Sequence, residues 1–335
     1  LLKARLPDAG FQHVPDRRRR ASVRWSMPTI LTAVVVTMAT GHHGLRAMEA
    51  LTAEMSRAGR RLLGIARRLP DTTARTALLG LEPSDLRDAL RRQVRQAHRR
   101  KALRPDGLPF GVVALDGKFA PAPPLWKSLW GLIRGRDTDH EYGLLGTLTA
   151  VLTSSRAKVV LDAAPIPRSW GEESRYPFVL DELVQAYGSL GLFQLVTYDA
   201  GACSRTNARA TRELGLDYLF RLKDGRQPKL TAQTHQRLGG LPLEQAVATH
   251  EGRYRGSISR RSVYLAEVPA VWPRWTGARA VVRIRCDRLD DTGAVLDTDE
   301  RYYVTSLAPG ALTGEQWIRV TRDHWAVENN GHHTL

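Results

Sequence analysis

The feature that most restricts the fold of this chain lies between residues 111 and 222, where short apolar segments alternate with amphipathic ones. Runs rich in β-branched residues predict strands at 111–116, 142–154, 157–162, 193–199 and 217–222. Helical spacing of apolar residues predicts helices at about 173–188 and 204–214. Consecutive strands followed by strands that alternate with helices are typical of a mixed sheet covered by helices. The sequence therefore predicts an α/β core.

The segments on either side of this core differ from it in pattern. Before it, Pro28 suits the first turn of a helix, and Asp71 or Thr72 suits an N-cap. After it come strand-like segments joined by the turn "DDTG", and then an amphipathic helix in which Thr313 and Gln316 suit a capping box. The expected domains are a basic arm (1–25), a helical domain (26–105), the core (108–249), an all-β insertion (250–308) and a final core helix (309–335).

The charge of the chain is strongly positive and uneven. Fifty Lys and Arg residues against 34 Asp and Glu give a formal net charge of +16, and residues 1–110 hold 22 basic and 9 acidic residues. Arginine suits phosphate oxygens, so we expect a nucleic acid partner, although Arg along helices is also common on a solvated face. Short helices joined by tight turns resemble a helix-turn-helix, which enters the major groove. The candidate DNA contacts in this part are Arg75, Arg91, Arg92 and Arg95.

Other features narrow the class of protein. Cys203 and Cys286 lack the spacing of a zinc site or a disulfide framework, which fits a reducing cytoplasm. The longest apolar run, residues 29–40, is too short to cross a bilayer. We therefore expect a cytoplasmic protein with no membrane segment.

Two of the predicted strands run directly into a carboxylate. Asp116 follows "GVVAL", and Asp199 follows "LFQLVTY". An Asp after a strand is commonly a turn residue. If the two strands are neighbours, however, the two like charges lie close together and require Mg²⁺ or Mn²⁺ between them. Glu328 lies in the last helix, within "RDHWAVENN", and is the candidate third ligand. Three such side chains suit two-metal phosphoryl transfer on DNA or RNA.

With these carboxylates in these sequence contexts, the chain resembles a known family, the DDE transposases of bacterial insertion sequences, and within it the "HW..EN" branch. "ALDGK" is similar to the motif of the first Asp and "VTYDAG" to that of the second. "GLDYLFRLKDGRQPKL" resembles the strand with a Tyr and a Lys, and "HEGRYRGSISRR" the basic start of the insertion. "RDHWAVENNGHHTL" resembles the helix of the final Glu, and "RLPDTTARTAL" the N-terminal helical region. The resemblance spans roughly residues 17–335.

The resemblance implies a ribonuclease H-like mixed sheet flanked by helices, with an all-β insertion and an N-terminal helical domain. It implies Mg²⁺-dependent end cleavage and strand transfer, with Mn²⁺ as a substitute, at Asp116, Asp199 and Glu328. The implied partner is double-stranded DNA, both the terminal inverted repeats and the target DNA. The resemblance also implies a dimer in the paired-end complex and a location at the nucleoid of a bacterial cell. Further DNA contacts are predicted at Lys118, Lys223, Arg322, His324, Trp272 and Trp275. Packing of a small sheet is an alternative role for the two Trp residues.

The sequence also departs from the family pattern. One branch has Tyr and Arg before the Glu and a Lys after it, where this chain has Thr321, His324 and Leu335. Family members continue beyond this point, and the chain begins with Leu1, so we expect it to be shortened. Three alternatives therefore stay open. In the first, the chain is a truncated or co-opted, catalytically inactive DNA-binding derivative of such a transposase. In the second, its carboxylates are only turn and cap residues. In the third, His324, Glu328 and His332 bind zinc from one helix face.

Overall fold

The computed structural model of the protein describes residues 9–19, 21, 23–122, 132–136, 141–167, 170–254, 257–269 and 275–332. Residues up to Arg100 form one compact unit, and residues from Lys101 form a second. Among the described residues, no helix has both the length and the apolarity to cross a membrane.

The first unit is helical. Its elements are η2 (Phe11–His13), α2 (Met27–Ala39), α3 (Leu45–Glu54), α4 (Arg57–Leu63), α5 (Asp71–Leu79) and α6 (Pro83–Arg99). Pro28 lies in the first turn of α2, as predicted. The predicted N-cap of α5 is wrong, because Pro70 is the N-cap and the backbone N–H of Asp71 already donates to the Glu49 side chain at 3.2 Å. Fully buried Ile30, Ile65 and Leu69 belong to the core of this unit.

The second unit contains one ten-stranded sheet. Its strands are β1 (Val112–Ala122), β2 (Leu132–Arg136), β3 (Glu141–Leu152), β4 (Val160–Pro165), β5 (Leu195–Tyr198), β6 (Asp217–Arg221), β7 (Ala248–Tyr254), β8 (Ser257–Glu267), β9 (Ala280–Leu289) and β10 (Val295–Thr305). Their order is β2-β3-β1-β5-β6-β10-β9-β8-β7, and β4 also pairs with β3. Strands β1, β5 and β6 pair in parallel, and the other pairings are antiparallel.

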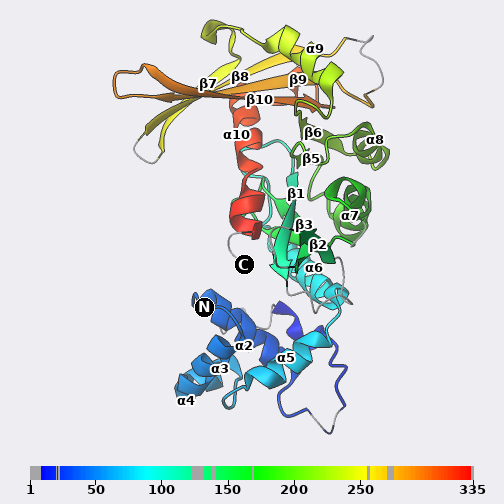
Figure 1. Cartoon of the computed structure of the whole chain (residues 1–335), viewed down its shortest axis with the longest axis vertical. Helices are drawn as coiled ribbons and strands as arrows, with labels where there is room; N and C mark the ends of the chain where they lie inside the picture. Colours follow the sequence, from blue (N-terminus) through cyan, green and yellow to red (C-terminus); the bar gives the residue numbers. More distant parts are fainter. Residues whose placement is uncertain are drawn as a thin grey trace. The chain divides into compact units, whose positions relative to one another are not determined.

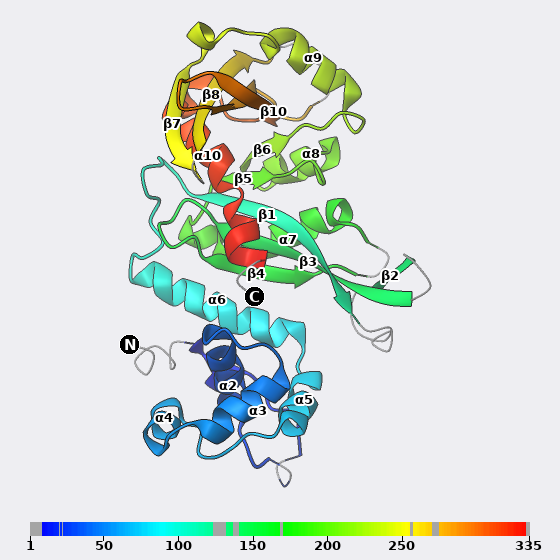
Figure 2. The ribbon, with the colours of Figure 1, turned by 60° about the vertical axis from the view of Figure 1, so that its left-hand side comes forward.

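Helices cover both faces of this sheet. The helical elements of the unit are α7 (Glu172–Tyr187), η5 (Gly188–Leu190), α8 (Arg205–Glu213), α9 (Pro228–Leu238), η6 (Leu243–Gln245), η7 (Pro309–Ala311), α10 (Gly314–Asp323) and the π-helical segment η8 (Val327–His332). Helices α7 and α8 lie on one side of strands β1, β5 and β6, and α10 with η8 lies on the other (Figures 1 and 2). The predicted mixed sheet flanked by helices is thus confirmed.

Some details differ from the sequence predictions. Strand β1 continues six residues past Asp116, because antiparallel pairing with β3 extends from Val113 to Ala122. The prediction of a single C-terminal helix is also wrong. The predicted capping box of Thr313 and Gln316 is present, but α10 ends at Asp323 and η8 follows after a break. Helix α9 and strand β2 were not predicted.

Helix α10 is fixed to the sheet by its apolar face. Trp317 is fully buried among residues of the sheet such as Leu195 and Val282, and its Nε1–H donates to the carbonyl of Pro309 at 3.1 Å. This packing determines where the chain after α10 meets the core.

We therefore expect Trp317→Ala to lower the free energy of unfolding by about 3–5 kcal/mol, the range for removing a buried aromatic side chain. The measurement is urea denaturation followed by circular dichroism. Leu296→Ala, at a side chain that is 59% exposed, is the control and should change the stability by less than about 0.5 kcal/mol. Equal effects of the two substitutions would contradict this packing.

Candidate metal centre

The register of the parallel strands brings the two predicted Asp residues together. The pairing of β1 with β5 ends with Leu115 opposite Tyr198, so Asp116 and Asp199 are the next residues on the two chains. Strand β5 ends there, and β1 continues alone on that side. Because side chains alternate along a strand, Asp116 points to the same face as Ala114, which packs against Val327 of η8.

A third carboxylate, Glu172, joins this pair from the other face of the sheet. Asp116, Glu172 and Asp199 each offer a carboxylate oxygen, and these oxygens lie within 4.8 Å of one another. Glu172 lies in the first turn of α7, and the hydroxyl of Tyr198 donates to its Oε2 at 3.4 Å. Sequence reasoning missed Glu172, because an acidic residue in a first helical turn is common for its favourable interaction with the helix dipole.

Two glycines leave the room that these carboxylates occupy. A Cβ on Gly117 would overlap the side chain of Glu172. A Cβ on Gly201 would lie 2.9 Å from Oδ1 of Asp199 and 3.1 Å from Oε2 of Glu172. The backbone N–H of Gly201 also donates to Asp199 at 2.6 Å, so Asp199 makes the turn contact that the alternative reading expects. The glycines in "LDGK" and "YDAG" were therefore the sequence signal for a crowded site.

The site concentrates negative charge. Burial and the nearby charges of Asp199, Glu172 and Glu328 raise the pKa of Asp116 to about 7. Burial and the charge of Asp199 also raise the pKa of Glu172. Carboxyl groups held this close resist ionisation unless a cation joins them.

The predicted third ligand, Glu328, stands apart from this group. It is exposed on η8, close enough for its charge to raise the pKa of Asp116, but outside the set of oxygens within 4.8 Å. The chain just before it is tied to β5, where Nδ1 of His324 and Oγ1 of Thr197 lie 2.8 Å apart in a hydrogen bond. Burial lowers the pKa of His324 to about 4, so its imidazole is neutral at pH 7.

The structure places the other predicted residues as follows. Lys118 lies on β1, two residues beyond Asp116 and on the same face. Lys223 is exposed just after β6, and Arg322 is exposed on α10 with its guanidinium 3.5 Å from Asp323. Trp275 is only 8% exposed, as the packing alternative expects, and Trp272 lies outside the described residues.

The candidate DNA contacts of the first unit lie on its last two helices. Arg75 is exposed on α5, and Arg92 and Arg95 are exposed on α6. Arg91 is partly buried and pairs with Asp88 at 3.2 Å. The buried residues of α6 are Ala89 and Val94, so its other face is left to charged side chains.

The donor set of this site fits a hard divalent cation. Every donor in the close group is a carboxylate oxygen, the ligand that Mg²⁺ and Mn²⁺ prefer, whereas zinc favours nitrogen and sulfur. The helix face proposed for zinc is interrupted, because α10 ends at Asp323 and Glu328 lies in the π-helical segment η8. The fold and site together are those of an α/β protein with an acidic centre compatible with a divalent metal.

Comparison with known proteins relates the chain to transposases. Residues 9–94 match the family described as DDE_Tnp_1-associated, a domain found in DDE-type transposase families. No curated protein matches the chain. The match lies in the helical first unit, so it supports a transposase-related protein independently of the acidic centre.

The raised pKa of Asp116 predicts how stability depends on pH. A carboxyl with a folded pKa of about 7 and an ordinary value of 3.8 stabilises the fold fully below pH 3.8, and this contribution is lost as the pH rises through 7. In EDTA, Tm should therefore fall between pH 5.5 and 8 by several degrees, at roughly 2–4 °C per kcal/mol. Differential scanning calorimetry on wild type and Asp116→Asn isolates the effect, because the variant should show a smaller fall. The same slope in both proteins would contradict the assignment.

The space at Gly117 gives a second prediction. Gly117→Ala should displace Glu172 and weaken the binding of Mn²⁺ by roughly 10-fold or more, the order that disturbing the surroundings of a metal ligand costs. Electron paramagnetic resonance of free Mn²⁺ measures the affinity. Gly310→Ala is the matched control, because a Cβ there has no neighbour within 4 Å. Unchanged Mn²⁺ affinity in Gly117→Ala would exclude Glu172 from the site.

Proposed function

We propose that the protein is a DDE-type DNA transposase that cleaves the ends of an insertion sequence and joins them to target DNA. The observation that carries this proposal is the convergence of Asp116 and Asp199 with Glu172 at the end of β5. The match of residues 9–94 to a transposase-associated domain supports it from a separate part of the chain.

The sheet supports a ribonuclease H-like core. Antiparallel strands β4, β3 and β1 are followed by parallel strands β5 and β6, and helices cover both faces. Strands β7 to β10 lie in the chain between this core and α10, where the β-rich insertion is expected. In this proposal the core extends over 108–249, and α10 and η8 complete it.

Asp116, Asp199 and Glu328, with Glu172 beside them, are the proposed ligands of Mg²⁺ or Mn²⁺. The metal would supply activation of a water or 3′-hydroxyl and stabilisation of the leaving oxygen. The bond between His324 and Thr197 fixes the chain before Glu328 against the strand of Asp199. Lys223 and Arg322 are exposed, so they are available to bind phosphates, and Lys118 lies on the strand of Asp116.

The proposed partner is double-stranded DNA. Arg75, Arg91, Arg92 and Arg95 on α5 and α6 would bind the terminal inverted repeats, with an affinity that falls steeply as salt rises. Cutting two ends together calls for a dimer in the paired-end complex. The proposed location is the bacterial nucleoid in the cytoplasm.

Cleavage assays test this proposal. Asp116→Asn, Asp199→Asn and Glu328→Gln should each reduce Mg²⁺-dependent nicking of DNA that carries the element ends by roughly 10²-fold or more. The assay is gel electrophoresis of plasmid substrate with the full chain, with and without EDTA. Glu213→Gln, at an exposed carboxylate on α8, is the control and should cleave like wild type.

The other outcomes are equally informative. Cleavage that persists in Asp116→Asn would contradict the proposed site. Binding to the ends without any metal-dependent nicking by wild type would favour a catalytically inactive DNA-binding derivative.

A further inference from the structure

The start of α7 is the part of the acidic centre that the sheet does not place. Pairing of β1 with β5 sets Asp116 beside Asp199, whereas Glu172 lies on a helix and has no strand register to fix it. A carboxylate oxygen of Glu172 nevertheless lies within 4.8 Å of the other two. Other contacts must therefore hold the first turn of α7 against residues 199–204, which we call the Asp199 loop.

The amide of Asn207, on α8, joins these two segments in the interior. Asn207 is only 1% exposed. Its Nδ2 donates to the carbonyl of Ala202, in the Asp199 loop, at 3.0 Å, and to the carbonyl of Glu173, in the first turn of α7, at 3.3 Å. Carbonyl oxygens only accept hydrogen bonds, so the nitrogen of the amide faces them and both of its N–H groups are used. One buried side chain thus ties the residue after Glu172 to the Asp199 loop.

Asn207 is itself held in place by several bonds. Its backbone N–H donates to Oγ of Ser204, the N-cap of α8, at 3.2 Å, and its backbone carbonyl accepts from Oγ1 of Thr211 at 2.7 Å. The Thr211 hydroxyl also bonds the hydroxyl of Tyr176, a fully buried residue of α7, at 2.7 Å. These bonds join α7 to α8 and leave the Asn207 side chain little freedom to move.

Arg226 joins the same two segments at the surface. It lies between β6 and α9, and its side chain is half exposed. Its Nη1 donates to the carbonyl of Gly201, in the Asp199 loop, at 2.5 Å, and to Oε2 of Glu173 at 3.2 Å. The Asp199 loop is thus tied to α7 on its exposed side as well as on its buried side.

The charge of Arg226 does not explain its place beside a cation site. Burial and the charge of Asp199 raise the pKa of Glu172, and the Tyr198 hydroxyl and the charge of Arg226 oppose this shift. A positive group repels a bound cation, so at a pH where Glu172 is ionised the charge of Arg226 weakens metal binding through space. The favourable contribution that Arg226 can make is the position of the two segments that it joins.

We propose that Asn207 and Arg226 are positioning residues of the metal centre, which hold the first turn of α7 against the Asp199 loop so that Glu172 reaches the same ion as Asp116 and Asp199. Neither residue would touch the ion. Residues that orient the ligands of a metal in this way commonly have a large effect on its affinity. The inference rests on the proposed function for the presence of the ion, and it adds two residues outside the acidic group, one on α8 and one after β6.

Titration with Mn²⁺ alone tests the role of Asn207. The full chain is titrated without DNA at pH 8, above the raised pKa of Asp116 of about 7, and electron paramagnetic resonance measures the free ion. Asn207→Leu, which keeps a side chain of similar size but has no donor, should weaken Mn²⁺ binding by roughly 10-fold or more. Equal affinity of folded Asn207→Leu and wild type would overturn the positioning role of Asn207.

Thr234→Val is the matched control for a buried polar side chain. Thr234 on α9 is also fully buried, and its hydroxyl donates to the carbonyl of Leu230, within its own helix, at 2.8 Å. This variant should lose stability in urea denaturation but bind Mn²⁺ like wild type. A loss of Mn²⁺ affinity equal to that of Asn207→Leu would show that any buried polar substitution disturbs the site, and would overturn the specific role of Asn207.

The sign of the effect at Arg226 distinguishes position from charge. Arg226→Ala should weaken Mn²⁺ binding by about 2- to 10-fold, the range for one net hydrogen bond, whereas loss of the positive charge alone would strengthen it. Arg226→Lys, which keeps a donor, should restore part of the affinity. Arg209→Ala, at an exposed arginine on α8 that pairs with Glu213 at 3.7 Å, is the control. Tighter binding by Arg226→Ala would overturn the positioning role of Arg226.

A double-mutant cycle with Glu172 shows whether the effect passes through that ligand. If Asn207 acts by placing Glu172, Asn207→Leu should cost little further Mn²⁺ affinity in a Glu172→Gln background, because both substitutions remove one interaction. A general structural effect of Asn207→Leu would instead add in full to that of Glu172→Gln, and this result would overturn the inference.

The results separate this inference from the proposed function. Mn²⁺ binding that behaves as expected, in a wild-type chain that does not cleave DNA, would overturn the transposase and confirm the positioning role. A wild-type chain that binds no Mn²⁺ would overturn both. Circular dichroism shows whether each variant is folded, and because Arg226 is half exposed, its variants keep the test decisive if Asn207→Leu does not fold.

Discussion

The parallel pairing of β1 with β5 is the constraint on which the rest of the second unit depends. It ends at Leu115 and Tyr198, and this end point sets Asp116 beside Asp199. Because β5 stops there, side chains from both faces of the sheet meet at one place. Glu172 arrives from the face of α7, and η8 with Glu328 packs on the opposite face.

Such an arrangement works against the stability of the metal-free fold. Clustered carboxylates repel one another, and the raised pKa of Asp116 reflects its burial first and that repulsion second. Buried Trp317 on α10 and the hydrogen bond between His324 and Thr197 fix the segment before Glu328 against the core. Strain of this kind is common at functional sites, where it is offset by the rest of the fold.

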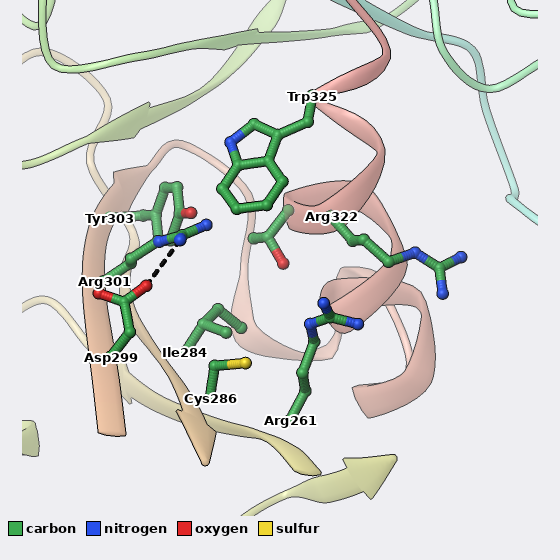
Figure 3. Close-up of a pocket in the computed structure, with 9 residues that line it drawn as sticks. Arg261, Ile284, Cys286, Asp299, Arg301, Tyr303, Arg322 and Trp325 are labelled. Atoms are coloured by element: carbon green, nitrogen blue, oxygen red, sulfur yellow. Dashed lines mark ion pairs between the residues drawn. The ribbon is translucent and has the colours of Figure 1, made fainter. Parts of the chain in front are cut away.

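The second unit also holds its clustered acidic and basic side chains in different places. The carboxylates lie at the end of β5, whereas Arg261 and Arg322, both shown in Figure 3, line a hollow between strands β7 and β8 and helix α10. In the proposed function, the acidic centre would require a cation, and the exposed Arg322 would bind a DNA phosphate. The same segment, from Arg322 to Glu328, contributes to both.

The sequence by itself determined the alternation of strands and helices, the basic first unit and the two Asp residues, because periodicity and charge are local properties. The sequence also shows the glycines after each Asp, but the reason for them, the space that the Glu172 side chain needs, appears only in the structure. Only the tertiary structure decided that Glu172 joins the site, that Trp275 is buried and that Trp325 is exposed. These outcomes depend on contacts between residues far apart in the chain, such as Gly117 with Glu172, and no local pattern encodes them.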